Sequence, residues 1–288
     1  MPVMYNNQNV DEKYSPILEP NLYYGSIFVP DVTCTDKYQT GPAGGIYVHK
    51  LKTTPCEVGK PGRDFSDEET QDELIPILLN NNFQKSKKIY GVQAAAVGID
   101  LANENLSLAI KETNEGRQQA ALACLVQEST ASSITSAMTA DTVKKDIIAV
   151  RTEFVKKKGT ADIIMCSPDF YALVLEAAGK EFTPNTNDRI AASGNVGNWL
   201  GFTFIEAVGL SATNAKYYDS TGSLKTVAFA GIDFIMYNHA ALSVIPNFET
   251  VRLRDSENFV GTKAQVELNV GYKLTNPALG LVRKTVGG

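Results

Sequence analysis

The sequence contains few residues of the types that most often carry chemistry. It has only two histidines, His49 and His239, and neither belongs to a His-Glu-x-x-His pattern. Its four cysteines stand at wide, irregular spacings with no Cys-x-x-Cys pair, which predicts reduced thiols rather than a zinc site. No Gly-x-Ser-x-Gly motif offers a nucleophile. We therefore expect no catalytic residues, no metal ligands and no cofactor.

Long hydrophobic runs and concentrated positive charge are also lacking. The longest uninterrupted apolar stretch, Ala120 to Val126, is far shorter than the roughly 20 residues of a membrane-spanning helix, so we expect no membrane partner. No cationic segment followed by an apolar run opens the sequence, which predicts no secretory signal. The 27 Lys and Arg residues against 32 Asp and Glu give a net charge of -5 without a basic arm. Tight non-specific binding of nucleic acid is therefore disfavoured.

A long helix is the first regular element that the sequence predicts. From Val92 to about Gln127 the chain is rich in Ala, Leu, Glu and Gln, and its apolar positions recur at helical spacing. A continuous helix of about 36 residues would form a rod of about 54 Å. Gly98 and Gly116 are the positions at which it could bend or break. A rod of this length suits an extended molecule.

Two shorter helices are predicted after the long one. Thr139 or Asp141 is expected to cap a helix that ends at Lys156–Lys158, where lysines complement the negative end of the helix. Ser167-Pro168 has the residue types of an N-cap and a first helical position, and Gly179 is the expected terminator of that helix.

Strands are predicted on both sides of the helical region. Residues 41–90 have the pattern of a long hairpin, in which Ile46–Leu51 is followed by turn residues and by a return strand from Leu74 to Tyr90. Pro76 places that return strand at a sheet edge, because proline donates no ladder hydrogen bond. In the last third of the chain we expect strands at 202–205, 227–236, 242–253 and 264–274. Apolar and polar residues alternate in the last of these, which predicts one buried and one wet face.

Two basic clusters interrupt an evenly charged chain. Lys156–Lys158 is explained by its position at a helix end. The other cluster, Lys85-Ser86-Lys87-Lys88, follows an acidic run with six Asp and Glu residues between positions 64 and 73. A segment that carries both signs suits pairing with a copy of itself on an adjacent subunit. A solvated charged face is the alternative interpretation.

The order of the predicted elements resembles that of a known protein family. The chain has an extended arm, a long two-stranded loop, a long helix, a helical central region and a long late strand. Several short stretches are also similar to that family, namely 62–65, 84–93, 167–173, 196–206, 248–259 and 276–279. Together they resemble the major capsid proteins of tailed double-stranded DNA bacteriophages, whose fold is named for phage Hong Kong 97.

This resemblance implies an α+β chain with the Hong Kong 97-like capsid fold. It implies an N-terminal arm at residues 1–40 and an extended β-hairpin loop (E-loop) at 41–90. The peripheral (P) domain, with the long spine helix and the long strands, would comprise 91–135 and 241–288, and the axial (A) domain would comprise 136–240. As subunit-interface residues we expect Arg63, Asp64, Lys85, Lys87, Lys88 and Trp199.

The resemblance also implies a structural function without catalysis. The protein would self-assemble into hexamers and pentamers of an icosahedral shell that encloses double-stranded DNA without sequence-specific contact. It would reside in the virion, and in the host cytoplasm before assembly. We expect a separate scaffolding protein and a portal as partners, because no helical scaffolding segment follows Met1. Isopeptide cross-linking is not expected, because the stretch Val260–Thr262 lacks the asparagine that cross-linking relatives use.

Two other functions stay open from the sequence alone. An encapsulin-like nanocompartment shell protein would resemble the same fold but would enclose enzymes. A cytosolic α/β enzyme that uses Asp, Glu or Ser would be a monomer or small oligomer with one deep polar pocket. A compact chain of this length would have a radius of gyration of about 19 Å, whereas a projecting arm and loop require a larger value.

Overall fold

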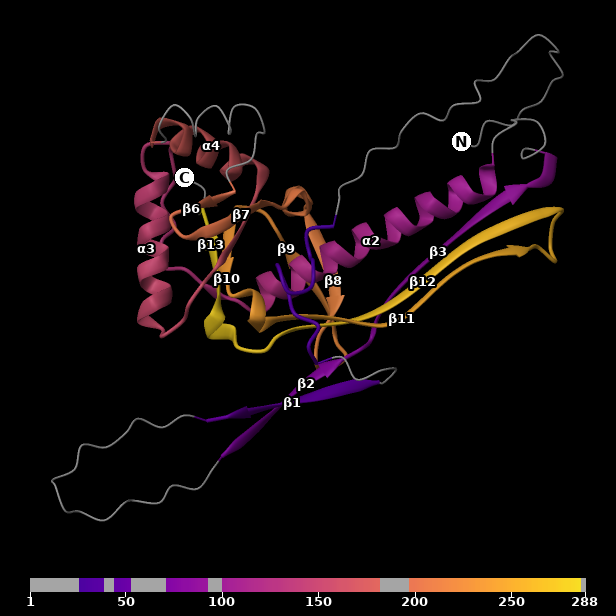
Figure 1. Ribbon diagram of the computed structural model, residues 1–288, viewed down its shortest axis with the longest axis horizontal. Coiled ribbons are helices and arrows are strands. Elements are labelled where there is room, and N and C mark those ends of the chain that lie inside the picture. Colours follow the sequence, from indigo (N-terminus) through magenta and orange to yellow (C-terminus); the bar gives the residue numbers. More distant parts are fainter. Residues whose placement is uncertain (1–25, 39–43, 53–70, 93–99, 182–196, 286–288) are drawn as a thin grey trace, which may run out of the picture.

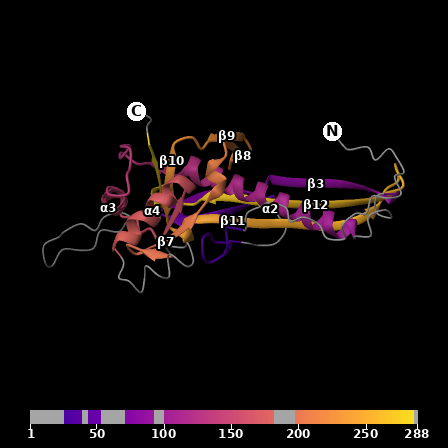
Figure 2. The same cartoon turned by 90° about the horizontal axis from the view of Figure 1, so that it is seen from above.

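The chain forms an elongated molecule with a broad end and a narrow end (Figure 1). The computed structural model describes residues 26–38, 44–52, 71–92, 100–181 and 197–285. The broad end holds a mixed sheet and two helices, and the narrow end is a long helix that lies along three long strands. Seen from above, this helix and these strands run side by side toward the narrow end (Figure 2).

The narrow end is built on a three-stranded antiparallel sheet with the order β11-β12-β3. Its strands are β3 (Asn81–Tyr90), β11 (Leu242–Asp255) and β12 (Gly261–Leu274). The alternation predicted for residues 264–274 is confirmed. One face of β12 is fully buried, through Ala264, Val266, Leu268, Val270, Tyr272 and Leu274. Because side chains alternate along a strand, the residues between them lie on the opposite face of the sheet.

Helix α2 (Leu101–Glu128) covers the apolar face of this sheet, mainly over β12 and β3. Asp100 caps the helix, since its carboxylate accepts a hydrogen bond from the backbone N of Asn103 at 3.2 Å. The predicted long helix is confirmed from Leu101 onward, and it passes through Gly116 without a break. One glycine costs a helix only about 1 kcal/mol, which packing on the sheet outweighs. The predicted stretch 93–99, with Gly98, lies outside the described residues.

The broad end contains a six-stranded sheet with the order β4-β13-β10-β5-β7-β6. Its strands are β4 (Thr130–Ala131), β5 (Ile163–Cys166), β6 (Asn198–Trp199), β7 (Phe202–Glu206), β10 (Ile232–Tyr237) and β13 (Gly280–Lys284). Helices α3 (Val143–Lys156) and α4 (Pro168–Glu181) share an apolar cluster with this sheet. The cluster includes Ile147, Phe154, Phe170, Val174, Phe234 and Met236.

The start of α4 is as predicted, and its end is not. The Ser167 hydroxyl accepts a hydrogen bond from the backbone N of Phe170 at 3.3 Å, which confirms Ser167 as the cap. The prediction that Gly179 terminates the helix is wrong, because α4 continues to Glu181. Gly179 does not adopt a positive φ, so its backbone does not leave the helix there.

Helix α3 also begins at a different residue from the one predicted. Its N-cap is Thr142 rather than Thr139 or Asp141. The side chain of Thr142 does not cap the helix, and its hydroxyl is 3.3 Å from the carbonyl oxygen of Thr139. The predicted end is confirmed within one residue, at Lys156.

Strands β1 (Gly45–Leu51) and β2 (Asp72–Leu78) form a separate two-stranded antiparallel sheet, here the β1–β2 hairpin. It confirms the predicted hairpin and the edge position of Pro76, since a two-stranded sheet consists only of edges. The prediction of one return strand from Leu74 to Tyr90 is wrong. That segment is interrupted at Leu79 and Asn80, after which β3 pairs with β12 instead of with β1.

The single strand predicted over 227–236 is also wrong, because two strands share that segment. Strand β9 (Leu224–Ala228) pairs with β8 (Asn214–Tyr218), whereas the next strand, β10, enters the six-stranded sheet. Gly231 makes the turn between β9 and β10 at φ +72°. A Cβ atom there would lie 2.9 Å from the carbonyl oxygen of Thr285, so the close approach also requires glycine.

Residues 26–38, the described part of the predicted N-terminal arm, pack on the body of the molecule. Phe28 and Cys34 are buried in the central apolar cluster. The side-chain oxygen of Gln118 on α2 accepts a hydrogen bond from the backbone N of Ile27 at 3.1 Å. Short 3-10 helices complete the described fold, at η1 (Val208–Ser211), η2 (His239–Ala241) and η3 (Pro277–Leu279).

Candidate functional site

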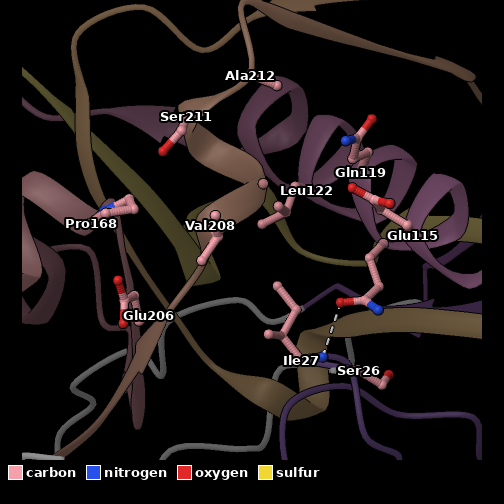
Figure 3. A pocket seen from close by; sticks show the side chains of 12 residues that line it. Ser26, Ile27, Glu115, Gln119, Leu122, Pro168, Glu206, Val208, Ser211 and Ala212 are labelled. Atoms are coloured by element: carbon pink, nitrogen blue, oxygen red, sulfur yellow. Dashed lines mark hydrogen bonds between the residues drawn. The ribbon is translucent and has the colours of Figure 1, made fainter. Parts of the chain in front are cut away.

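A pocket of about 790 Å³ lies between α2, the start of α4 and η1 (Figure 3). Its ionisable side chains are Glu115 on α2 and Glu206 at the end of β7. The described residues that line it include no histidine, cysteine, lysine or arginine. Two serines also line it, but neither is hydrogen-bonded to a glutamate of the pocket, and the Ser26 hydroxyl donates instead to the carbonyl oxygen of Phe28 at 3.2 Å. These described residues therefore do not pair a nucleophile with a base.

The described cysteines are poor candidates for chemistry. Cys34, Cys124 and Cys166 are all buried and unpaired with one another. Burial raises the pKa of each thiol, that of Cys34 to about 11. Because the thiolate is the reactive form, a raised pKa makes these side chains unreactive near neutral pH.

Each histidine pairs with one aspartate of its own chain. His49 Nδ1 lies 2.5 Å from Asp72 Oδ2 across the β1–β2 hairpin. His239 pairs with Asp162, which also accepts a hydrogen bond from the backbone N of His239 at 2.9 Å. Within the described ranges, no three His, Cys, Asp or Glu side chains gather where they could hold a metal ion. None of the described helices is both long and apolar enough to cross a membrane.

Of the residues predicted at subunit interfaces, Arg63 and Asp64 lie outside the described residues, and two lysines pair within the chain. Lys85 Nζ lies 2.8 Å from Glu112 Oε2, and Lys87 Nζ lies 2.7 Å from Glu112 Oε1. Burial acts to raise the pKa of Glu112, but the two lysines outweigh it and lower that pKa. These ion pairs join β3 to α2. A contact of either lysine with another subunit stays a prediction.

Lys88 lies on the opposite face of the sheet, in a row of three cations. In the register of the sheet, Lys88 on β3 lies opposite Lys263 on β12, and Lys263 lies opposite Arg254 on β11. Like charges that face one another across strands repel. Arg254 has Glu257 as a partner at 2.5 Å, and Lys263 lies 5.8 Å from the ring centre of Phe259. Lys88 is exposed and pairs with no anion among the described residues. This cation row therefore carries unbalanced positive charge.

The rest of this uncovered face is polar. Glu267 lies on the middle strand, β12, and its carboxylate accepts hydrogen bonds from two side chains of β3, Asn82 at 2.9 Å and Gln84 at 2.8 Å. These bonds, first that of Asn82, lower the pKa of Glu267 and keep it ionised. A groove of about 530 Å³ crosses the face, lined in part by the half-exposed ring of Phe248. Charge, amides and one exposed ring are the components of a surface that can dock a partner.

Sequence reasoning missed two of the three residues in the cation row. The alternation of β12 already placed Lys263 on the wet face, so a signal for it was present. No local signal connected Lys263 to Arg254 or to Lys88, because the three residues come together only through strand pairing.

Trp199 is a core residue in the single chain. Its side chain is only 6% exposed, and its ring centre lies 5.8 Å from that of Phe204. The tight turn that follows holds Leu200 at φ +53° and Gly201 at φ +84°, a backbone that leucine rarely adopts. Trp199 thus anchors this turn from inside. Its predicted role at an interface stays a prediction.

The β1–β2 hairpin has one buried face and one exposed apolar face. Its inner face packs against Ile245 of β11 through Val48, Ile75 and Ile77. The opposite face exposes large apolar side chains, with Tyr47 at 65%, Leu51 at 62% and Leu74 at 52%. The exposed His49–Asp72 pair lies among these side chains on the same face. Large apolar side chains gathered on an exposed face in this way mark an interaction surface.

The backbone arrangement relates this chain to known structures where its sequence does not. No family model and no curated protein sequence matches it. Its mixed α+β fold is nevertheless the fold of phage capsid chains, shared over nearly the whole length.

Three solved structures illustrate that similarity. A chain from Mycobacterium phage Che8 matches with a TM-score of 0.76 at 14% identity, covering 98% of this chain and 100% of that chain. The capsid structure of the cyanophage P-SCSP1u gives 0.73 at 12% identity, covering 99% and 94%. The mature capsid of bacteriophage PhiM1 gives 0.64 at 13% identity, covering 100% and 97%. At such identities the similarity lies in the fold.

Proposed function

We propose that this chain is the major capsid protein of a tailed double-stranded DNA phage. It would self-assemble into hexamers and pentamers of an icosahedral shell around the packaged DNA. The observation that carries the proposal is the fold shared end to end with phage capsid chains. The β1–β2 hairpin supports it, because a projecting two-stranded hairpin is marginally stable alone and exposes an apolar face that a neighbouring subunit could cover.

The finer assignments belong to the same proposal. The arrangement is the Hong Kong 97-like one, with α2 as the spine helix and the β1–β2 hairpin as the base of an E-loop. The arm would comprise 1–40 and the E-loop 41–90. The P domain would comprise 91–135 and 241–288, and the A domain 136–240. The projection of β1 and β2 away from the body supports the assignment of the β1–β2 hairpin to the E-loop (Figure 1).

The proposed role requires no catalysis by the chain. Its partners would be copies of itself, a separate scaffolding protein, a portal and the packaged DNA, which it would touch without reading its sequence. The net charge of -5 supports loose contact with a polyanion. The protein would occupy the host cytoplasm before assembly and the virion afterwards.

The cation row gives this proposal a charged subunit contact. Arg254, Lys263 and Lys88 lack enough neighbouring carboxylates, whereas the sequence between 64 and 73 carries six acidic residues. Strand β2 begins at Asp72, and the hairpin projects away from the narrow end that carries the row (Figure 1). The acidic stretch of one subunit, Asp64 included, would neutralise the row of its neighbour. Arg63 would serve at the margin of that contact, Lys85 and Lys87 would contact a neighbour from the side of the sheet that α2 covers, and Trp199 would hold its turn near the capsomer centre.

Electron microscopy of the purified chain tests the proposed function. The chain is expressed alone and together with any scaffolding gene that neighbours its own, and particles are examined by negative staining with light scattering. We expect rings, sheets, tubes or closed shells. DNA or scaffold inside the shells supports a phage head, whereas enzyme cargo would support a nanocompartment. A compact monomer under both conditions contradicts assembly.

Charge reversal tests the contact proposed for the cation row. Lys263→Glu and Lys88→Glu should each lower the yield of assembled particles at least several-fold, because repulsion replaces attraction at every copy of the contact. Raising the salt concentration should weaken assembly of the unchanged protein more than that of the variants. Lys216→Glu, on the exposed face of β8, is the matched control and should assemble normally. Equal yields for all variants would refute the contact.

A further inference from the structure

The β1–β2 hairpin is joined to the body by a connection of only Leu79 and Asn80 on its β2 side. It shares no ladder of hydrogen bonds with another sheet of the described residues. Its direction therefore depends on what holds this short junction and on the packing of its inner face.

The side of the junction nearest β12 is fixed by a close approach of backbones. A Cβ atom on Gly271 would lie 2.4 Å from Leu79 Cδ2 and 3.0 Å from the carbonyl oxygen of Leu78. The base of the hairpin thus sits directly on the backbone of β12. The backbone N of Leu79 also donates to the carbonyl oxygen of Gly44 at 3.2 Å, which closes the base. Apolar packing at such a point resists separation, but it is non-directional.

The shortest directional bonds between this junction and β8 come from Asn81, the first residue of β3, beside a longer one from the Asn80 amide nitrogen to the carbonyl oxygen of Asp219 at 3.5 Å. Its amide nitrogen donates to the carbonyl oxygen of Tyr218 at 3.1 Å, and its amide oxygen accepts from the backbone N of Tyr218 at 2.7 Å. Asn81 is 3% exposed. Its side chain occupies the place of an added strand residue beside β8, and β8 itself packs on α2. Both bonds are partly buried, so their loss would leave the N–H and C=O of Tyr218 without this partner in the protein.

We propose that Asn81 is the positioning residue that sets the direction in which the β1–β2 hairpin leaves the body. Its amide locks the junction to β8, and Gly271 provides the point on which the hairpin would otherwise pivot. A hairpin held in one direction presents its exposed apolar face to neighbours at one angle. The consequence for assembly rests on the proposed function, whereas the effect on hairpin direction does not.

The direction of the hairpin can be measured by double electron–electron resonance. Spin labels are placed by Tyr47→Cys on β1 and Arg252→Cys on β11, in a chain with Cys56→Ser, and diluted with unlabelled chain. The remaining cysteines are buried. We expect one narrow distance distribution for the reference protein and a broadened or shifted one for Asn81→Ala. Asn82→Ala is the matched control, because Asn82 is exposed and bonds Glu267 on the opposite face.

Asn81→Asp provides a reversible version of the same test. Its carboxylate still accepts from Tyr218 N but cannot donate to Tyr218 O, whereas the protonated acid can do both. Burial raises the pKa of such a carboxyl group. The distribution should therefore be broad at about pH 8 and narrow at about pH 5, while the reference protein stays narrow at both. General loss of stability would not produce this recovery.

Each outcome bears on one proposal. A narrow, unshifted distribution for folded Asn81→Ala, or no recovery of Asn81→Asp in acid, overturns the role of Asn81. If the reference protein never assembles but Asn81→Ala still broadens the distribution, the proposed function fails and the positioning role stands. If both hold, Asn81→Ala should convert closed shells into irregular particles, and Asn82→Ala should not.

Discussion

The turn between β8 and β9 depends on the ionised side chain of Asp219. Burial acts to raise its pKa, but hydrogen bonds from Thr221 and Ser223 and the nearby Lys225 outweigh it, and the pKa falls to about 2. A carboxyl group with a lowered folded-state pKa adds stability above its unfolded-state pKa near 4. That stability is lost as the pH falls through the folded-state value.

Asp219→Asn should therefore lower the free energy of unfolding by about 1–2 kcal/mol at pH 7, after allowance for solvent screening. The difference from the reference protein should shrink between about pH 4 and pH 2. Urea unfolding at pH 7, 4 and 2 measures it, and Asp255→Asn at the exposed end of β11 is the control. A gap of equal size at pH 7 and pH 2 would contradict the assignment.

Single residues were predictable where the determinant is local. Ser167 caps α4 because a serine before proline and an apolar face is sufficient to start a helix. The partners of the lysines in residues 85–88 were not predictable, because the three lysines look like one cluster in the sequence. Strand alternation sends Lys85 and Lys87 to Glu112 and sends Lys88 to the other face. Their partners follow from pairing, which the local sequence does not contain.

Two glycines in different elements should respond in opposite directions to the same change. Gly179 lies inside α4, and a Cβ atom there would meet nothing within 4 Å. Gly179→Ala should stabilise the protein by about 0.5–1 kcal/mol, because alanine favours the helix. Gly271→Ala in β12 should destabilise it by about 1–3 kcal/mol, because Leu79 and the Leu78 carbonyl already occupy the space.

Urea unfolding of both glycine variants at one pH measures the two effects. Each variant serves as the control for the other, since both add one methyl group to a backbone with ordinary φ. A stable Gly271→Ala protein would show that the hairpin base can move away from β12. That result would also weaken the assignment of Gly271 as a pivot point.

Elements with a sustained period were predictable, and their junctions were not. The strand β12 repeats one alternating pattern along its length, and α2 combines apolar residues at helical spacing with a composition that favours helix, so both could be identified from the sequence. The breaks at Leu79–Asn80 and at Gly231 are set by where the next strand finds its partner. Gly179 failed as a predicted helix end for a related reason, since a glycine ends a helix only where the backbone turns left-handed.

The shape of the whole molecule gives a prediction that requires no assembly. A compact chain of this length would have a radius of gyration of about 19 Å. The narrow end and the projecting hairpin should raise the value measured by small-angle X-ray scattering clearly above that figure (Figures 1 and 2). The measurement is made on dilute monomer, with a dilution series to exclude aggregates. A value at or below 19 Å would rule out the extended form in solution.

At this scale the order of elements was the informative part of the sequence. An arm, a hairpin, a long helix and a late alternating strand resembled capsid proteins although no sequence relative matches. The backbones are similar at only 12–14% sequence identity. The order of elements can be shared where the residues differ, because many sets of side chains can fill the same layers. The cation row and the Asn81 contact lie beyond such reasoning, since both are products of this chain's particular pairings.

The pairing of β3 with β12 has a consequence for how the protein comes to be made. Asn81 pairs with Val270 and Tyr90 with Gly261, and the whole of α2, α3, α4 and β4 to β11 lies between them in the sequence. Loops of that length close slowly, and among the described strands β3 pairs only with β12, which is synthesised late. The three-stranded sheet can therefore be completed only late in synthesis, so a nascent chain does not present a complete narrow end before its last strands have been made.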